Sequence, residues 1–318
     1  MSKIQLFENN SEIGAGTRGS SLGVEGLKIA AFNSNSSFFK KFKSKVIPTK
    51  NHVLNEKEKH PKAKRIDSII DVCSSVSEHV SSAIKKHQFP FLLSGDHSSA
   101  IGTIAGIKSA NPSLRLGVIW IDAHADLHSP YTTPSGNVHG MSLSASLNQD
   151  NFSRRVHELD HLTNQQWEKL KKLDNIYPKV LVDDIVFLGV RSTEDPEDYF
   201  IIDNDINKIS VEHVRRNGAE IVSKEVLEYL SACDLLYISF DVDSLDCDLV
   251  SYGTGTPVPN GFTENEAAGL INNLLVDKRT CCLEVVEINP CLDNKQNKMA
   301  ETALRVIEHA SSIIEKRG

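Results

Sequence analysis

Six carboxylate and imidazole side chains stand just after short apolar runs of the sequence: His97, Asp122, His124, Asp126, Asp241 and Asp243. If they meet in one poorly hydrated place, the four carboxylates repel one another unless cations balance them. Two divalent ions would do so, because carboxylates can bridge ions about 3.5–4 Å apart. Oxygen-rich ligands without thiolates favour Mn²⁺ over Zn²⁺ or copper. Water shared by two such ions has a lowered pKa and would supply hydroxide for hydrolysis.

The apolar runs before these side chains predict strands of a parallel sheet. The runs are 89–94, 116–121, 184–190, 235–240 and 281–288. Their alternation with helix-like segments is typical of a parallel sheet covered by helices on both faces. The carboxyl ends of parallel strands share one edge, where ligands usually bind. We therefore expect the six side chains to converge at that edge.

The stretch 122–126 carries the strongest metal signal. If the chain stays extended after its strand, the period of two places Asp122, His124 and Asp126 on one face. A single Asp-x-Asp pair, as at 241–243, is more often a turn or a helix cap than a metal site. The strand endings taken together favour the metal site. His128 continues the alternation, but packing or support of a ligand explains it equally well.

Three segments carry helix signals. Residues 66–87 place apolar side chains at near-helical spacing. Residues 263–277 begin with Thr263 and have Glu266 three positions later, which is a capping-box pair. Residues 297–315 are expected to form a terminal helix.

Two polar stretches, 32–45 and 50–65, are predicted to be surface loops with no binding role. The chain contains no internal repeat and no Pro/Gly-rich linker typical of a domain boundary. We therefore expect a single domain over residues 1–318.

Composition and charge exclude several classes of protein. The 318 residues are 40% hydrophobic and 24% charged, which argues against a disordered chain. The net charge of -7 disfavours nucleic acid or an anionic membrane as the main partner. The first residues lack the apolar core of a secretory signal, and no stretch approaches the length of a membrane span. The six cysteines lack CxxC pairing, so we expect reduced thiols and a cytoplasmic protein.

Six motifs resemble those of the ureohydrolase family, which comprises arginases, agmatinases and relatives that hydrolyse guanidino compounds. They are SGDHSSAIG (94–102), DAHADLHSP (122–130), SGNVHGMSL (135–143), SFDVDSLD (239–246), GTGTPV (253–258) and EVVEINP (284–290). The motifs stand in family order, and GAGTRGSSLGVEGL (14–27) resembles the family's glycine-rich opening. The resemblance covers most of the chain from residue 89 onward.

The resemblance implies a three-layer α/β/α fold around a mostly parallel sheet. It also implies two Mn²⁺ ions per subunit, with Co²⁺ as a possible substitute, and it assigns the metal ligands to the same six residues that the chemical argument selects. A homo-oligomer, commonly a trimer or a multiple of trimers, is implied as well.

The segment SGNVHG (135–140) favours L-arginine as the substrate. In arginases the serine and the asparagine of this pattern contact the α-carboxylate, so the resemblance assigns that role to Ser135 and Asn137. Agmatine lacks this carboxylate, and agmatinases generally lack the pattern. His128 takes the place of an asparagine that many arginases have near the same carboxylate, where a histidine can also donate a hydrogen bond.

Three catalytic residues are implied by the same resemblance. His139 matches the acid/base histidine, a role that suits its near-neutral pKa. Glu287 matches the glutamate that holds the guanidinium, because a carboxylate can accept two parallel N–H bonds from that planar cation. Asp126 belongs to both the metal-ligand set and the catalytic set. Without the resemblance, a glutamate beside a sheet edge would be read as solvated.

Two further substrate contacts are implied. Thr256 could place its hydroxyl near the guanidinium, although a turn role is equally reasonable. In GVRSTEDPEDYF (189–200), Asp195 is the best match, with one residue inserted, to an aspartate that faces the α-amino group of the substrate. Glu194 is the alternative.

The expected reaction is hydrolysis of L-arginine to L-ornithine and urea by hydroxide that bridges two manganese ions. The closest alternative is a relative that acts on agmatine, formimidoylglutamate or a guanidino acid. A metal-dependent deacetylase shares the sheet architecture but would use one zinc ion and usually paired histidines. A non-catalytic metal-binding protein is disfavoured because His139 and Glu287 accompany all six ligands.

Overall fold

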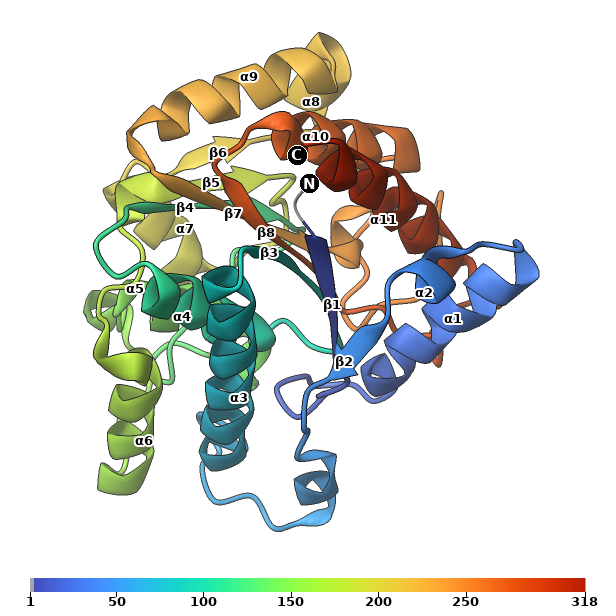
Figure 1. The fold of residues 1–318 in the computed structure, drawn as a ribbon. Coiled ribbons are helices and arrows are strands. Elements are labelled where there is room, and N and C mark those ends of the chain that lie inside the picture. The colour runs from blue at the N-terminus through green and yellow to red at the C-terminus, as the bar shows by residue number, and fades with distance from the viewer. Residues whose placement is uncertain (1–2, 318) are drawn as a thin grey trace.

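One sheet of eight strands lies between two layers of helices in the computed structural model, which describes residues 3–317 (Figure 1). The strands are β1 (Lys3–Asn9), β2 (Ser44–Val46), β3 (Gln88–Ser94), β4 (Leu116–Ile121), β5 (Ile185–Leu188), β6 (Asn207–Ile209), β7 (Leu235–Asp241) and β8 (Thr280–Val286). Their order across the sheet is β2-β1-β3-β8-β7-β4-β5-β6, and all neighbours are parallel. The expected fold class is confirmed.

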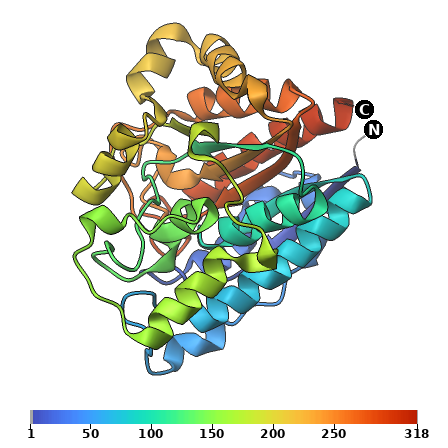
Figure 2. The same cartoon turned by 90° about the vertical axis from the view of Figure 1, so that its left-hand side faces the viewer.

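Helices cover both faces of this sheet. One face carries α1 (Gly23–Asn33), α2 (Phe38–Lys41), α8 (Val211–Asn217), α9 (Ala219–Tyr229), α10 (Glu264–Val276) and α11 (Lys298–Lys316). The other carries α3 (Ile66–Lys85), α4 (Ser99–Ala110), α5 (Ser142–Leu147), α6 (His161–Lys171) and α7 (Asp195–Asp203). Figure 2 shows α3 and α6 side by side on the second face. Within residues 3–317, each helix is too short or too polar to span a lipid bilayer.

The central strands are apolar on both sides because helices cover both sides. Every residue of β4 is buried. Val118 and Trp120 belong to the core beneath α3 and α4, whereas Ile119 and Ile121 belong to the core on the opposite face. A strand buried in this way reads as a continuous apolar run instead of an alternating pattern.

The apolar runs predict five interior strands correctly and miss β1 and the two edge strands. All five predicted strands are present, as β3, β4, β5, β7 and β8. The strands β1, β2 and β6 were not predicted. β2 and β6 have three residues each and form the two edges of the sheet, where pairing partners rather than an apolar run decide the conformation.

The three predicted helices form at nearly the predicted bounds, as α3, α10 and α11. The capping box at the start of α10 is present. Thr263 Oγ1 accepts a hydrogen bond from the Glu266 amide at 3.2 Å, and Glu266 Oε2 accepts one from the Thr263 amide at 2.8 Å.

The prediction of surface loops at 32–45 and 50–65 is wrong in part. The first stretch contains α2 and the first residues of β2. Phe38, the first residue of α2, is buried. The second contains a short 3-10 helix at Asn51–Asn55, and Ala63 is fully buried. A few apolar side chains anchor both stretches, although polar residues dominate their sequence.

Candidate metal centre and active site

The candidate site lies at the carboxyl ends of four strands that are neighbours in the sheet, β3, β8, β7 and β4. Each strand delivers at least one of the predicted side chains at or just after its end. In the sequence these strands are far apart, but their parallel pairing brings their ends to one edge. The expected convergence is therefore what the structure shows.

The first cluster forms around His97. Its Nδ1 atom lies 3.1 Å from Asp122 Oδ2, 3.2 Å from Asp126 Oδ2 and 3.2 Å from Asp241 Oδ2. One imidazole nitrogen thus faces three carboxylate oxygens. The ligand atoms of His97, Asp122 and Asp241 lie close enough together to hold one cation, and Asp126 stands beside them.

The orientation of the His97 ring is fixed from two sides. Its Nε2 atom lies 2.7 Å from Ser239 Oγ, and the ring stacks on Trp120 with a centroid distance of 4.0 Å. Since Nε2 is occupied by the Ser239 hydroxyl, Nδ1 is directed at the carboxylates. Partners of this kind orient a metal-binding histidine and fix its tautomer.

A second cluster forms around His124 and shares Asp122 with the first. His124 Nδ1 lies 2.9 Å from Asp243 Oδ2 and 3.6 Å from Asp122 Oδ1. Thr256 donates a hydrogen bond from Oγ1 to Asp243 Oδ2 at 3.0 Å. The two oxygens of Asp122 therefore face the two clusters, as expected of a carboxylate that bridges two cations.

The unpartnered atoms and the crowded carboxylates of the two clusters are what a site for cations would show. His97 Nδ1 and Asp122 Oδ2 are buried and find no hydrogen-bond partner among residues 3–317, an arrangement that is costly unless something else satisfies them. Burial raises the pKa of Asp241 well above its usual range, and the Asp243 and Asp122 carboxylates raise it further. A pair of divalent cations would relieve this repulsion.

The backbone after β4 differs from the extended chain that we expected. The His124 amide donates to Asp122 Oδ1 at 2.6 Å, and this side-chain contact bends the chain. Asp126 then adopts a left-handed conformation with φ 51°, which costs a non-glycine residue about 1–2 kcal/mol. The bend divides the side chains between the two clusters, with Asp126 beside His97 and His124 beside Asp243.

Glu287 and His139 form a pair beside the first cluster. Glu287 Oε1 accepts a hydrogen bond from the His97 amide at 2.9 Å and lies 3.1 Å from His139 Nδ1. Glu287 is also left-handed, with φ 66°. Burial alone would lower the pKa of His139, but the Glu287 carboxylate raises it to about 9.

A cavity of about 300 Å³ opens from the two clusters toward solvent. The predicted substrate residues His128, Ser135, Asn137 and Thr256 line it, as does the predicted catalytic residue His139, whereas Glu287 is not among the lining residues. Ser135 is exposed at its rim, whereas His128 is buried. Thr256 is oriented toward Asp243.

Asp195 lies outside this cavity, exposed at the first residue of α7, whereas Glu194 and Glu197 line it. Glu194 caps α7, and Glu197 reaches back to the Glu194 amide at 3.2 Å, so the helix phase turns Asp195 outward. His128 Nε2 lies 3.4 Å from Glu194 Oε2 and 3.5 Å from Glu197 Oε2.

Glu197 was not identified from the sequence. Burial raises its pKa to about 7, although the amides of Leu127 and Glu194 donate to its carboxylate. The Glu-x-x-Glu spacing around Pro196 is the signal of a helix start that would have found it. Ser239 and Trp120 were also missed as supports of His97, because nothing in a buried strand marks which of its side chains face a ligand.

The sequence is similar to those of known proteins. A sequence model described as the Arginase family covers residues 9–312. An arginase of Bacillus subtilis is 36% identical over 245 residues, 77% of this chain and 76% of that protein.

Two solved structures agree with the sequence comparison. A crystal structure of the Bacillus subtilis arginase has a TM-score of 0.78 and 31% identity, and the match covers 97% of this chain and 98% of that one. The arginase of Bacillus caldovelox has a TM-score of 0.82 and 29% identity, with 98% of each chain covered. The chain therefore belongs to the arginase family.

Proposed function

We propose that the protein is an arginase, a metal-dependent hydrolase that converts L-arginine to L-ornithine and urea. The observation that carries this proposal is the sharing of Asp122 by two histidine–carboxylate clusters at the inner end of the cavity that His139 lines. Two metals beside an acid/base group suit the hydrolysis of a poor electrophile such as a guanidinium. The curated relatives of similar length, which are arginases, support the same reaction.

The cations that fit best are two Mn²⁺ ions, with Co²⁺ as a substitute. His97, Asp122, Asp126 and Asp241 would hold one, and Asp122, His124 and Asp243 the other. When bound, the pair would lower the pKa of a shared water and supply hydroxide as the nucleophile. The hard oxygen ligands favour manganese over zinc.

Glu287 and His139 would act on the guanidinium end of the substrate. Glu287 is buried and faces His139, so its carboxylate can accept N–H bonds from the guanidinium and orient it. A pKa of about 9 keeps His139 protonated near neutral pH. It can therefore give a proton to the amino group of ornithine as that group leaves.

The opposite part of the cavity would hold the α-amino and α-carboxylate groups. Ser135 and Asn137 offer hydrogen-bond donors for the carboxylate. Glu194 and Glu197 offer acceptors for the ammonium group, and we assign that contact to them instead of Asp195 because they line the cavity. His128 stands between the two sets, with Nε2 toward the glutamates.

The organisation of the enzyme follows from the family. We propose that residues 1–318 form a single catalytic domain, which the one continuous sheet supports. We propose a homo-oligomer, a trimer or a multiple of trimers, on the family resemblance.

Urea release tests this function. The purified protein, preincubated with Mn²⁺ or with Co²⁺, is assayed on L-arginine and on agmatine side by side, with and without chelator. We expect metal-dependent release from L-arginine and little from agmatine. A preference for agmatine would overturn the substrate assignment but keep the metal chemistry, whereas metal binding without turnover of either compound would overturn the enzyme.

A pair of matched variants tests the amino-group contact. Glu194→Gln should raise the KM for L-arginine, while Asp195→Asn, one residue away and outside the cavity, should leave it unchanged. A larger effect of Asp195→Asn would restore the assignment made from the sequence.

A further inference from the structure

A segment that the sequence left without a function, residues 58–65, packs against the loop that carries Ser135 and Asn137. The Lys64 amide donates a hydrogen bond to the Gly136 carbonyl at 2.8 Å. Gly136 is left-handed with φ 77°, and a Cβ atom there would lie 2.0 Å from the Pro61 carbonyl oxygen. We call residues 135–137 the carboxylate loop. The segment 58–65 is its direct support.

Arg65 ties the same segment to a second loop, residues 13–16, which we call the glycine loop. Its Nε donates to the Ile13 carbonyl at 2.5 Å and its Nη2 to the Ala15 carbonyl at 3.3 Å. The side chain is 14% exposed. The Glu58 carboxylate accepts the Arg65 amide at 3.2 Å and so holds this end of the segment in place.

The glycine loop reaches the active site at Gly14, between the two carbonyls that Arg65 holds. The Gly14 amide donates to Asp96 Oδ2 at 2.9 Å, and the Gly14 carbonyl accepts the His139 amide at 3.2 Å. At Gly16, a Cβ atom would lie 2.5 Å from Asn137 Nδ2. The glycine loop therefore touches both the proposed acid/base residue and the proposed carboxylate contact.

We propose that Arg65 is a positioning residue that fixes the spacing between His139 and the carboxylate loop. This inference rests on the proposed function. Arg65 acts through the glycine loop on His139, while the adjacent Lys64 amide holds the carboxylate loop. The substrate that fits has an α-carboxylate at the distance from its guanidinium that L-arginine has. Without the guanidinium of Arg65 the hydrogen bond between the Gly14 carbonyl and the His139 amide remains, but the glycine loop loses its tie to the segment that holds the carboxylate loop.

The test uses Arg65→Asn in the metal-loaded protein. Asparagine tolerates the left-handed conformation of Arg65, whose φ is 58°, so the backbone keeps its course while the two loop contacts are lost. A misplacement of about 1 Å can cost about 100-fold in catalysis, so we expect kcat for L-arginine to fall about tenfold through His139 and KM to rise through the carboxylate loop, with metal content unchanged. Arg65→Lys, which keeps one donor group, should recover part of the affinity.

Arg279→Asn is the matched control, because Arg279 is also half-buried and donates to backbone carbonyls, those of Leu230, Cys233 and Leu227, far from the site. It should lower the melting temperature and leave KM unchanged. An unchanged KM in Arg65→Asn, or equal changes in both variants, would overturn the inference.

Hydrogen exchange separates this inference from the proposed function. In Arg65→Asn the amides of 13–16 and 135–139 should exchange faster, while those of α10 should not. If the wild-type protein releases no urea, the proposed function fails, and the exchange pattern alone then decides whether Arg65 positions the two loops. Uniform loss of protection would make Arg65 a general structural residue and would overturn the proposal.

Discussion

A cavity lies at the carboxyl ends of the strands and another at their amino ends, and the two differ in the charge and burial of the residues that line them. At the carboxyl end, a cavity of about 300 Å³ is lined by the buried carboxylates of Asp126, Asp241 and Asp243 and by the half-buried imidazoles of His124 and His139, which converge. At the amino end of β1, a groove of about 960 Å³ lies between β1, β2 and the end of α11. Five exposed lysines line this lysine groove, namely Lys3, Lys41, Lys43, Lys45 and Lys316.

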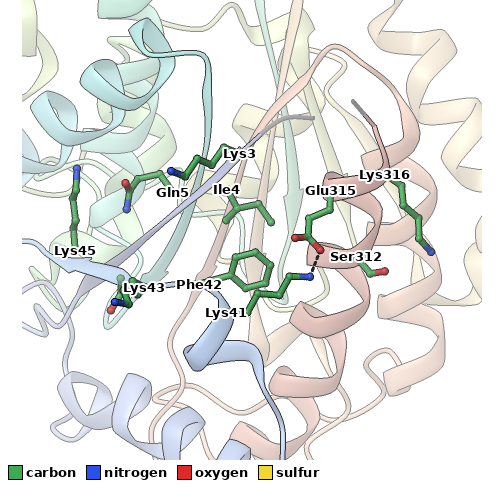
Figure 3. Close-up of a pocket in the computed structure, with 11 residues that line it drawn as sticks. Lys3, Ile4, Gln5, Lys41, Phe42, Lys43, Lys45, Ser312, Glu315 and Lys316 are labelled. Carbon is green, nitrogen blue, oxygen red and sulfur yellow. Dashed lines mark hydrogen bonds and ion pairs between the residues drawn. The ribbon is translucent and has the colours of Figure 1, made fainter.

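The charged groups of the larger groove are exposed and do not converge on one point. Figure 3 shows Lys45 and Lys316 pointing apart, while Lys41 pairs with Glu315. Exposed ammonium groups remain hydrated, and lysines beside an edge strand such as β2 discourage pairing with other chains. Convergence and burial of charged groups, rather than volume, distinguish the candidate active site.

Removal of the carboxylate shared by the two clusters should have the largest effect on the candidate site. Asp122→Ala should release metal from both clusters and lower kcat at least about 1000-fold, because water without the metals regains a pKa near 15.7. Elemental analysis and urea release measure the two effects. Asp184→Ala removes a buried aspartate paired with Arg115 before β5 and should lower stability but retain metal. Full metal content in Asp122→Ala would refute the ligand assignment.

The next largest effect should come from Glu287→Gln. The amide can no longer accept two charge-assisted bonds from the guanidinium, so kcat/KM should fall about 100-fold while metal content stays unchanged. Steady-state kinetics and elemental analysis on the same preparation separate the two quantities. Loss of metal from this variant would make Glu287 a ligand instead of a substrate contact.

A moderate, pH-dependent effect is expected at Glu197. Burial raises its pKa to about 7, so its carboxyl is neutral below that pH and ionised above it. Only the ionised form attracts an ammonium group strongly. The ratio of kcat/KM between wild type and Glu197→Gln should therefore rise from pH 6 to pH 8. A ratio that is constant across this range would remove Glu197 from substrate binding.

The smallest effect should come from the lysine groove. Lys41→Ala breaks an exposed pair with Glu315, and such pairs contribute about 0–1 kcal/mol to the free energy of unfolding. We expect no change in kcat/KM and a small shift in denaturation midpoint that vanishes at high salt. A large loss of activity would show that the amino end influences catalysis.

The parts of the candidate site differ in how well the sequence predicts them. The central strands are buried on both faces and read as apolar runs, so their ends, and with them the two histidine–carboxylate clusters, could be located without a structure. The helix start at Glu194 could not, because one residue of register decides whether Glu194 or Asp195 faces the cavity. The contacts of Arg65 could not be predicted either. They are made to backbone carbonyls, which every residue type has, so the sequence does not indicate them.

The parallel arrangement of the four central strands has a consequence for folding. The His97 amide meets the Glu287 carboxylate 190 residues away in sequence, so the centre has a very high contact order. Contacts of this kind form slowly, after the entropy of closing long loops has been overcome. We expect both metal clusters to be completed only when β8 has joined the sheet. Ions that bind there will slow unfolding of the finished protein more than they speed its folding.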